Sequence, residues 1–212
     1  YPVVSGNVSF YNGTNKNNIH PTPVIGGVGL IKNLKKIQNH KLKKIGSKII
    51  IIGKTFGHLG QSAYLNELYD LNGGIPPEVN LLNEKNNGDI VLKLINSGFV
   101  NSVHDVSTGG IILALAEMSI SSQIGIKILK PKKLSNLFEY FFGEDQSRYL
   151  VEIDQNNYSK IEKLLKDNNI YFDTIGFTQK EHFELDKNLK ISVKELYDLN
   201  NRWYNKYYGF VS

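Results

Sequence analysis

Two polar side chains near the start of the sequence have a spacing that suits nucleotide chemistry. In a strand over residues 1–10, Asn7 and Ser9 project from the same face, about 7 Å apart, because successive side chains alternate. An amide oxygen is a hard ligand for Mg²⁺, and a hydroxyl suits an anionic or polar substrate. Gly6 has no side chain to hold a phosphate away from the backbone. These residues predict one edge of a nucleotide site; the alternative is the solvated face of an amphipathic strand.

A glycine-rich turn at Gly53–Ser62 follows a buried apolar run. Its backbone N–H groups are candidates to cradle a phosphate at the start of a helix. The triplet that begins at Gly53 resembles part of a Walker A loop, but Lys48 stands where that loop needs its first glycine. The sequence therefore argues against a P-loop.

Two acidic segments complete the candidate chemistry. Asp105 ends a predicted strand, which is a favoured ligand position in α/β sheets; the alternative is a structural turn in which Ser107 or Thr108 caps the next helix. The second segment, Glu144–Gln146, is expected either to pair with Arg148 in a salt-bridged turn or to bind a cation.

The elements that position these residues follow from hydrophobic periodicity. Prolines mark the start of a second strand in residues 20–31, which we expect to belong with the first. Residues 49–52 are four isoleucines, typical of a strand buried on both faces. Later strands are predicted at 100–103, 124–129, 148–153 and 171–176, and helices at 61–71, 89–97, 110–121, 158–167 and 193–207. The aromatic residues of the last helix are expected to pack on the core or on a partner: Tyr197, Trp203, Tyr204, Tyr207 and Tyr208.

The composition excludes several classes of site. The 212 residues contain no cysteine, so disulfides, thiolate zinc sites and cysteine nucleophiles are excluded. The net charge is +5, but the lysines between Lys32 and Lys48 have no interleaved aromatic residue for stacking on bases, so we expect no nucleic-acid partner. No apolar run is long enough to span a membrane. Because no initiator methionine or leader is present, we expect a fragment of a longer protein.

Four ordered motifs resemble one family, the synthetase (large) subunit of phosphoribosylformylglycinamidine synthase, also called formylglycinamide ribonucleotide amidotransferase. The motifs are Pro2–Asn12, Pro21–Gly29, His104–Gly110 with Ala114–Met118, and Phe142–Leu150. The resemblance extends from Pro2 to about Gly176 and implies a superfamily fold like that of aminoimidazole ribonucleotide synthetase. The expected fold class is α/β of the α+β kind. Residues 1–45 would be the terminal strands of the second N-domain with a linker, and 46–212 a complete layered C-terminal domain with a mixed sheet.

The resemblance also implies an activity. The family uses ATP and Mg²⁺ to convert formylglycinamide ribonucleotide and ammonia to the amidine through an iminophosphate intermediate, in purine biosynthesis. Carried over to this sequence, Gly6 would lie at the ATP, Asn7 would bind Mg²⁺ and Ser9 would contact the ribonucleotide. The family's catalytic residues lie in the first half, so none is expected here, and His104 is not one of them.

The implied partners are the missing N-terminal half of the same enzyme, a glutaminase subunit that supplies ammonia, and a small accessory subunit, in the cytoplasm. The fragment alone is expected to be inactive. Asp105 and Glu144–Gln146 are expected either to retain an auxiliary nucleotide or to be structural. Two alternatives stay open: another ATP-dependent member of the superfamily, similar to selenophosphate synthetase, or a noncatalytic interaction module.

Overall fold

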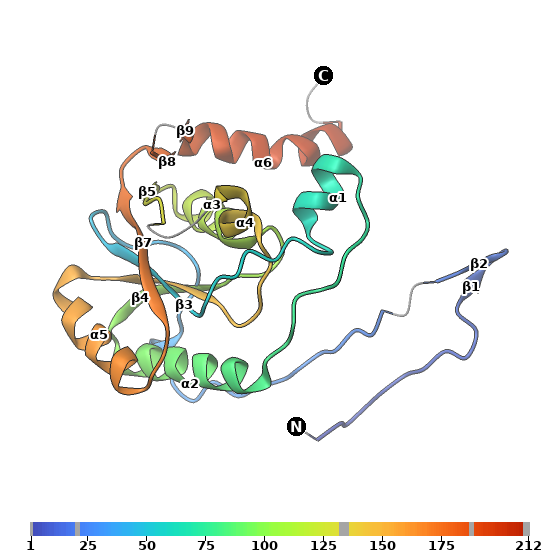
Figure 1. Cartoon of the computed structure of the whole chain (residues 1–212), viewed down its shortest axis with the longest axis horizontal. Coiled ribbons are helices and arrows are strands. Elements are labelled where there is room, and N and C mark those ends of the chain that lie inside the picture. The colour runs from blue at the N-terminus through green and yellow to red at the C-terminus, as the bar shows by residue number, and fades with distance from the viewer. Residues whose placement is uncertain (1, 20–21, 132–135, 187–188, 210–212) are drawn as a thin grey trace. The chain divides into compact units, whose positions relative to one another are not determined.

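The chain divides into two compact units in a computed structural model, which describes residues 2–19, 22–131, 136–186 and 189–209. Contacts separate Tyr1–Lys32 from Asn33–Ser212 (Figure 1). This division falls before the domain boundary predicted at residues 45 and 46, because residues 33–47 are hydrogen-bonded to the second unit. The predicted boundary between an N-domain and a C-terminal domain stays a prediction.

The first unit contains a short hairpin in place of the two predicted strands. Strands β1 (Gly13–Thr14) and β2 (Asn17–Asn18) pair antiparallel. Residues 2–9 and 22–31 have no regular secondary structure, so the strand predictions are wrong for this chain. The physical reason is that a strand needs a hydrogen-bonded neighbour and a surface on which to bury its apolar side chains, whereas Val4 is 93% exposed and Val8 77% exposed.

The second unit is built on a seven-stranded mixed sheet with the order β4-β6-β3-β7-β5-β8-β9. Neighbouring strands pair antiparallel except β5 and β8, which are parallel. The mixed sheet confirms the predicted fold class. The strands are β3 (Lys48–Ile52), β4 (Val100–Asp105), β5 (Gly125–Ile128), β6 (Tyr149–Ile153), β7 (Phe172–Gln179), β8 (His182–Leu185) and β9 (Leu189–Ser192).

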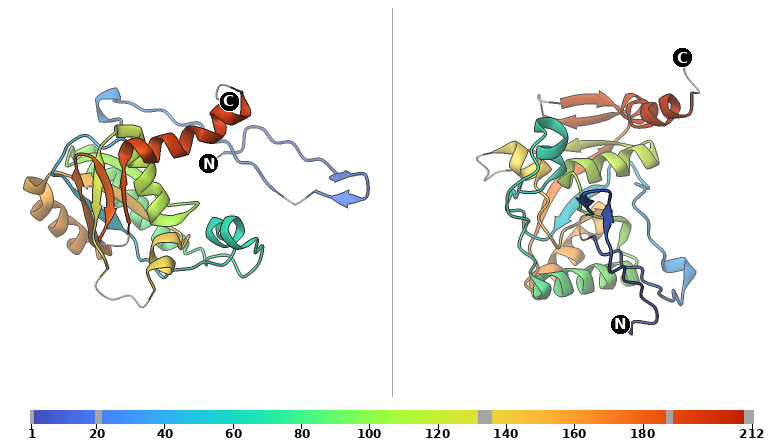
Figure 2. Two further views of the ribbon diagram at one scale, coloured as in Figure 1. Left: turned by 90° about the horizontal axis from the view of Figure 1, so that it is seen from above. Right: turned by 90° about the vertical axis from the view of Figure 1, so that its right-hand side faces the viewer.

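Helices cover both faces of this sheet and make a three-layered unit, which Figure 2 shows from two further directions. One face packs against α2 (Leu81–Ser97) and α5 (Tyr158–Asp167), and the other against α3 (Gly110–Ser122), α4 (Leu137–Phe142) and α6 (Val193–Tyr207). The remaining helical elements are α1 (Ala63–Tyr69), η1 (Leu34–Lys36) and η2 (Gln155–Asn157). Within the described residues, no helix has the length and apolar character needed to cross a membrane.

Strand β3 lies inside the sheet, between β6 and β7, and contributes side chains to both cores. Ile49 and Ile51 join the apolar cluster on the α3 side, whereas Ile50 and Ile52 join the cluster on the α2 side. All four side chains are at most 1% exposed. This confirms the prediction of a strand buried on both faces, because alternate isoleucines point to opposite sides of the sheet.

The periodicity predicted most helices of the second unit correctly and missed five short elements. The helices at 158–167 and 193–207 are α5 and α6 with the predicted bounds. Helix α2 begins at Leu81, eight residues before the predicted start, because the Asn80 side chain caps it by accepting the N–H of Asn83. The short elements η1, α4, η2, β8 and β9 were not predicted, since three to six residues are too few to display a period.

Candidate functional site

The residues predicted to bind nucleotide and substrate lie in the first unit and are open to solvent. Gly6, Asn7 and Ser9 are all exposed, and they lie near one another because they are close in the sequence. Among the described residues, no atom lies within 4 Å of a Cβ atom added to Gly6. The Ser9 carbonyl accepts a hydrogen bond from the Asn12 side chain at 2.7 Å, which folds residues 9–12 into a turn. The roles assigned to these three residues stay predictions.

The predicted phosphate cradle of the second unit is filled by a carboxylate of the protein itself. In the glycine-rich turn, the backbone N–H groups of Phe56 and Gly57 both donate to Asp145 Oδ2 at 2.9 Å. The N–H of His58 donates to Asp145 Oδ1 at 3.2 Å. Successive N–H groups that converge in this way form an anion site, and here the anion is the side chain of a residue 5% exposed. The turn therefore holds Asp145 in place of a phosphate.

Arg148 belongs to the same hydrogen-bond network. Its guanidinium, which is fully buried, donates to the carbonyls of Asp145 at 2.9 Å and Gly143 at 2.7 Å, and to the Thr55 hydroxyl at 3.2 Å. Arg148 Nη1 lies 3.7 Å from Asp145 Oδ2. Burial lowers the pKa of the Arg148 guanidinium from its ordinary value, and the Asp145 carboxylate opposes that shift. The predicted salt-bridged turn is therefore present, with the loop N–H groups as additional partners.

Glu144 joins two segments that are far apart in the sequence. Its Oε1 atom accepts the N–H of Ala63, at the start of α1, and the N–H of Gly109, before α3, both at 2.8 Å. Gly109 is the N-cap of α3 with φ 77° and caps it without a side chain, so the predicted caps Ser107 and Thr108 are wrong. The backbone N–H groups at this helix start are met by Glu144 and by the Ser107 carbonyl instead.

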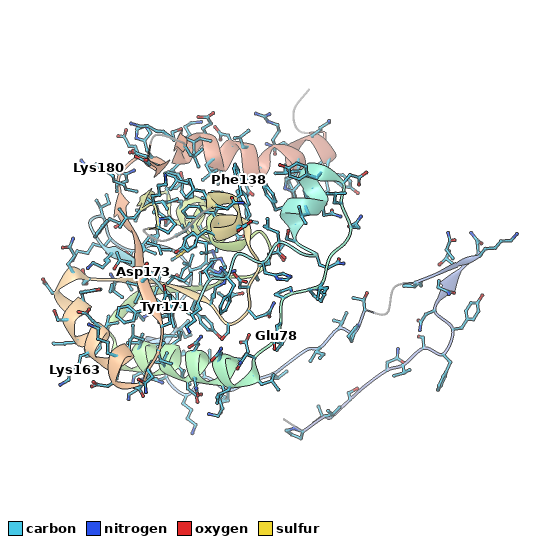
Figure 3. All side chains as sticks on the ribbon, viewed as in Figure 1. Glu78, Phe138, Lys163, Tyr171, Asp173 and Lys180 are labelled. Carbon is cyan, nitrogen blue, oxygen red and sulfur yellow. The ribbon has the colours of Figure 1, made fainter. Side chains whose placement is uncertain are left out.

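A pocket of about 320 Å³ opens beside this network. It lies between the glycine-rich turn and the start of α2, where Asn80 and Asn83 supply carboxamide groups. The exposed Gln146 side chain also lines it, and Glu78, labelled in Figure 3, comes from the segment before α2. The complete lining is Phe56, His58, Pro77, Glu78, Asn80, Asn83, Asp145, Gln146 and Ser147. The pocket offers hydrogen-bonding groups, while the Asp145 carboxylate at its base is already bonded.

Asp105 lies at the end of β4, as predicted, and its side chain is 68% exposed. Its Oδ1 atom lies 3.3 Å from His104 Nδ1, although neighbours within a strand face opposite sides. The contact is possible because the strand ends at this residue. The other ring nitrogen, His104 Nε2, lies 2.9 Å from Glu117 Oε2 on α3.

Metal binding and the aromatic helix are the remaining expectations. Across the described ranges, no group of three or more His, Cys, Asp or Glu residues is arranged to hold a metal ion. The aromatic side chains of the last helix that we expected on the core or on a partner are between 45% and 77% exposed, which contradicts packing on the core.

Sequence reasoning also missed Glu152, a buried carboxylate on β6; an isolated glutamate in an apolar strand was the available signal.

Comparisons of sequence place these features in a family. Residues 44–187 match the family described as "AIR synthase related protein, C-terminal domain". The chain is 45% identical over 207 residues to phosphoribosylformylglycinamidine synthase subunit PurL of Pelagibacter ubique, and 40% identical over 212 residues to that of Bartonella bacilliformis. These alignments cover 98% and 99% of this chain but 28% of each relative, so the chain spans under a third of their length.

Solved structures share the fold. Thermotoga maritima PurL complexed with FGAR superposes with a TM-score of 0.66 at 18% identity, covering 77% of this chain and 30% of that one. The same protein complexed with ATP gives 0.60 at 17% identity, covering 77% and 28%. Escherichia coli HypE, a hydrogenase maturation protein, gives 0.52 at 16% identity, covering 74% and 52%. The chain therefore belongs to the family of AIR synthase related proteins, and its residues 44–187 form the C-terminal domain of that family.

Proposed function

We propose that this chain is the C-terminal part of a phosphoribosylformylglycinamidine synthase, an ATP-dependent ligase that forms a C–N bond between formylglycinamide ribonucleotide and ammonia. The observation that carries the proposal is the 45% identity over 98% of the chain to a PurL subunit. Because the chain spans 28% of that relative, the proposed activity is that of a longer protein, and this part alone is inactive.

The exposed first segment supports a role in a site completed by other parts of the protein. Gly6 is proposed to lie at the phosphates of ATP, because it has no side chain to hold a phosphate away from the backbone. Ser9 is proposed to contact the ribonucleotide through its hydroxyl, a donor and acceptor suited to a phosphate or ribose. In support of both ligands, Thermotoga maritima PurL has been solved in complexes with ATP and with FGAR.

Asn7 is proposed to contribute one ligand to Mg²⁺. This chain fits that limited part, since Asn7 presents an exposed amide and the described residues contain no cluster of three metal-ligating side chains. Mg²⁺ in nucleotide sites is bound by one or two protein groups together with phosphates and water, so the remaining ligands would come from outside the chain. The ion would neutralise phosphate charge there.

The second unit is proposed to act as a scaffold in this half of the enzyme. The carboxylates of Glu144 and Asp145 accept backbone N–H groups from three segments, which leaves them engaged in holding the fold. We therefore assign Glu144 and Asp145 a structural role. Gln146, exposed beside the pocket, is the member of this motif that remains available to a ligand.

The proposed partners follow from the same relatives. Thermotoga maritima PurL has been solved within an assembly named PurLQS, which supports a multi-subunit enzyme. We propose that this chain works with the rest of the synthetase, a glutaminase subunit that supplies ammonia and a small accessory subunit, in the cytoplasm. On α6, the Tyr197, Trp203 and Tyr207 side chains are 46%, 65% and 77% exposed, and we assign this helix to such contacts.

The test is to mix this chain with the separately expressed remainder of the protein and to measure ADP release. The mixture is supplied with ATP, Mg²⁺, formylglycinamide ribonucleotide and ammonium, and each part is assayed alone. We expect ADP release in the mixture and formation of the amidine product, measured by mass spectrometry, with neither part active by itself.

Two further measurements make the result specific. Replacing formylglycinamide ribonucleotide by selenide tests the selenophosphate synthetase alternative, since a fold by itself does not identify a reaction. Association of the two parts is followed by gel filtration. If the parts associate and no ADP forms with any substrate, the ligase proposal is wrong and the interaction module remains.

A further inference from the structure

A segment of seven residues, 38–44, runs along the open edge of the sheet, and we call it the strap. Strand β4 is the terminal strand, so its outer side has no neighbouring strand within the sheet. The Asn39 carbonyl accepts the N–H of Val103 at 3.1 Å, and the Gln38 side chain donates to the Val100 carbonyl at 3.3 Å. Covering an edge in this way protects it from pairing with another chain.

The strap is anchored firmly at its C-terminal end. Both oxygens of Glu152, a residue with no exposed surface, accept strap N–H groups: Oε2 from Lys43 at 2.9 Å and Oε1 from Lys44 at 3.0 Å. The Leu42 side chain, 4% exposed, joins the apolar cluster on the α3 side. The Ser102 hydroxyl on β4 also donates to Glu152, at 3.0 Å. A change at the other end of the strap therefore acts as a local opening and leaves this anchor in place.

The other end of the strap contains a pair of histidines. The rings of His40, on the strap, and His104, on β4, have centroids 5.1 Å apart. His104 is bracketed by Glu117 at 2.9 Å and Asp105 at 3.3 Å, so its imidazolium form can donate to a carboxylate from each nitrogen. His40 therefore lies beside an imidazole whose two nitrogens already face carboxylates.

We propose that the strap is a pH-sensitive attachment, in which a proton on His40 releases residues 38–40 from β4 while the Glu152 anchor holds. The groups that face His40 are Lys41 from the strap itself, His104 and Asp105 from β4, and Glu117 from α3. Lys41 and the protonated form of His104 oppose a charged His40, and the two carboxylates are already shared with His104.

The direction of the effect follows from the pKa of His40. Burial lowers it from the ordinary value of 6.5 and His104 lowers it further, whereas Glu117 acts in the opposite direction. A released strap binds the proton more readily than an attached one, so acid favours release. Attachment is at full strength above the ordinary pKa and is lost as the pH falls through the lowered pKa of His40.

The test measures amide hydrogen exchange of the Val103 N–H in the full chain by NMR, as a protection factor corrected for the intrinsic effect of pH. Between about pH 8 and about pH 5 we expect protection to fall by about threefold or more, with the midpoint of the His40 imidazole titration recorded in the same samples. The comparison of these two midpoints needs no variant and remains decisive if a substitution disturbs folding.

Two variants and a control complete the experiment. His40→Gln, neutral at every pH, is expected to keep Val103 protected in acid, whereas His40→Lys is expected to weaken protection at every pH. His182→Gln, on β8, removes a histidine from a strand that does not adjoin β4 and should match the wild type. The proposal is overturned if protection of Val103 does not fall, if the fall lies outside the interval between the ordinary pKa of histidine and the titration midpoint of His40, or if His40→Gln loses protection as the wild type does.

Discussion

The Asp145 carboxylate accepts the backbone N–H of Gly57 at 2.9 Å, across a separation of 88 residues in the sequence. The same oxygen accepts the N–H of Phe56, and Asp145 is held by Arg148 on the other side. The glycine-rich turn has the composition of a phosphate site, but in this arrangement its N–H groups hold the Asp145 segment and its role is structural. Its stability is therefore the first property to test.

Asp145→Asn is expected to destabilise the second unit by about 3 kcal/mol. The substitution keeps the size of the side chain but turns an NH₂ group toward backbone donors and leaves the buried Arg148 without its counter-charge. The measurement is the free energy of unfolding in urea. Asp89→Asn, an exposed member of a helical ion pair with Lys85, is the matched control and should cost about 0.5 kcal/mol or less. Equal costs would show that the Asp145 network contributes little.

Two glycines with similar φ angles allow the cost of a left-handed backbone to be measured separately from the cost of a steric clash. Gly110 has φ 69° and an added Cβ would lie 2.6 Å from the Phe141 carbonyl oxygen, whereas Gly98 has φ 72° and open space around it. Gly98→Ala should cost about 1 kcal/mol from the left-handed backbone alone, and Gly110→Ala about 3 kcal/mol or more. Thermal unfolding of both variants checks this ranking, which a larger loss at Gly98 would contradict.

Tyr140 is expected to make the protein sensitive to alkali. Burial raises the pKa of this phenol above its ordinary value of 10.0, and Asp173 and Tyr171, both labelled in Figure 3, raise it further. The stabilising contribution is complete below the unfolded pKa and falls by about 1.4 kcal/mol per pH unit as the pH rises toward the folded pKa.

Unfolding free energies measured on either side of pH 10 test this expectation, and Tyr140→Phe should make the alkaline slope shallower by that amount. Tyr197→Phe, at an exposed position on α6, should leave the slope unchanged. An unchanged slope in Tyr140→Phe would assign the alkaline loss to other groups.

Asn7→Ala is expected to lower turnover of the assembled enzyme far more than Asp105→Ala, by about a hundredfold against less than about threefold. The reason is that Asn7 is proposed to reach the metal, whereas Asp105 contacts His104 at the end of β4. Steady-state kinetics across Mg²⁺ concentrations checks the ranking, with Asn18→Ala in the hairpin as a control for loss of an exposed amide. Comparable losses for Asn7 and Asp105 would remove the distinction between a ligand and a structural residue.

Local patterns were sufficient for much of the second unit. The four isoleucines at 49–52 predicted a strand buried on both faces because no polar residue interrupts them, and helix α5 shows a full amphipathic period over ten residues. These features depend on neighbours along the chain. The resemblance of four motifs likewise led from the sequence to the family that residues 44–187 match.

Tertiary structure alone decided which groups meet. The N–H donors of the glycine-rich turn and the Asp145 carboxylate are separated by 87 to 89 residues in the sequence. The sequence predicts the turn as an anion site and the segment around Asp145 as an acidic turn. Only the folded structure shows that the carboxylate of the second is the anion bound by the first. The opposite case is residues 2–9, whose alternating pattern predicts a strand that does not form in this chain. A helix closes its hydrogen bonds within one segment, whereas a strand depends on a partner that its own sequence does not contain.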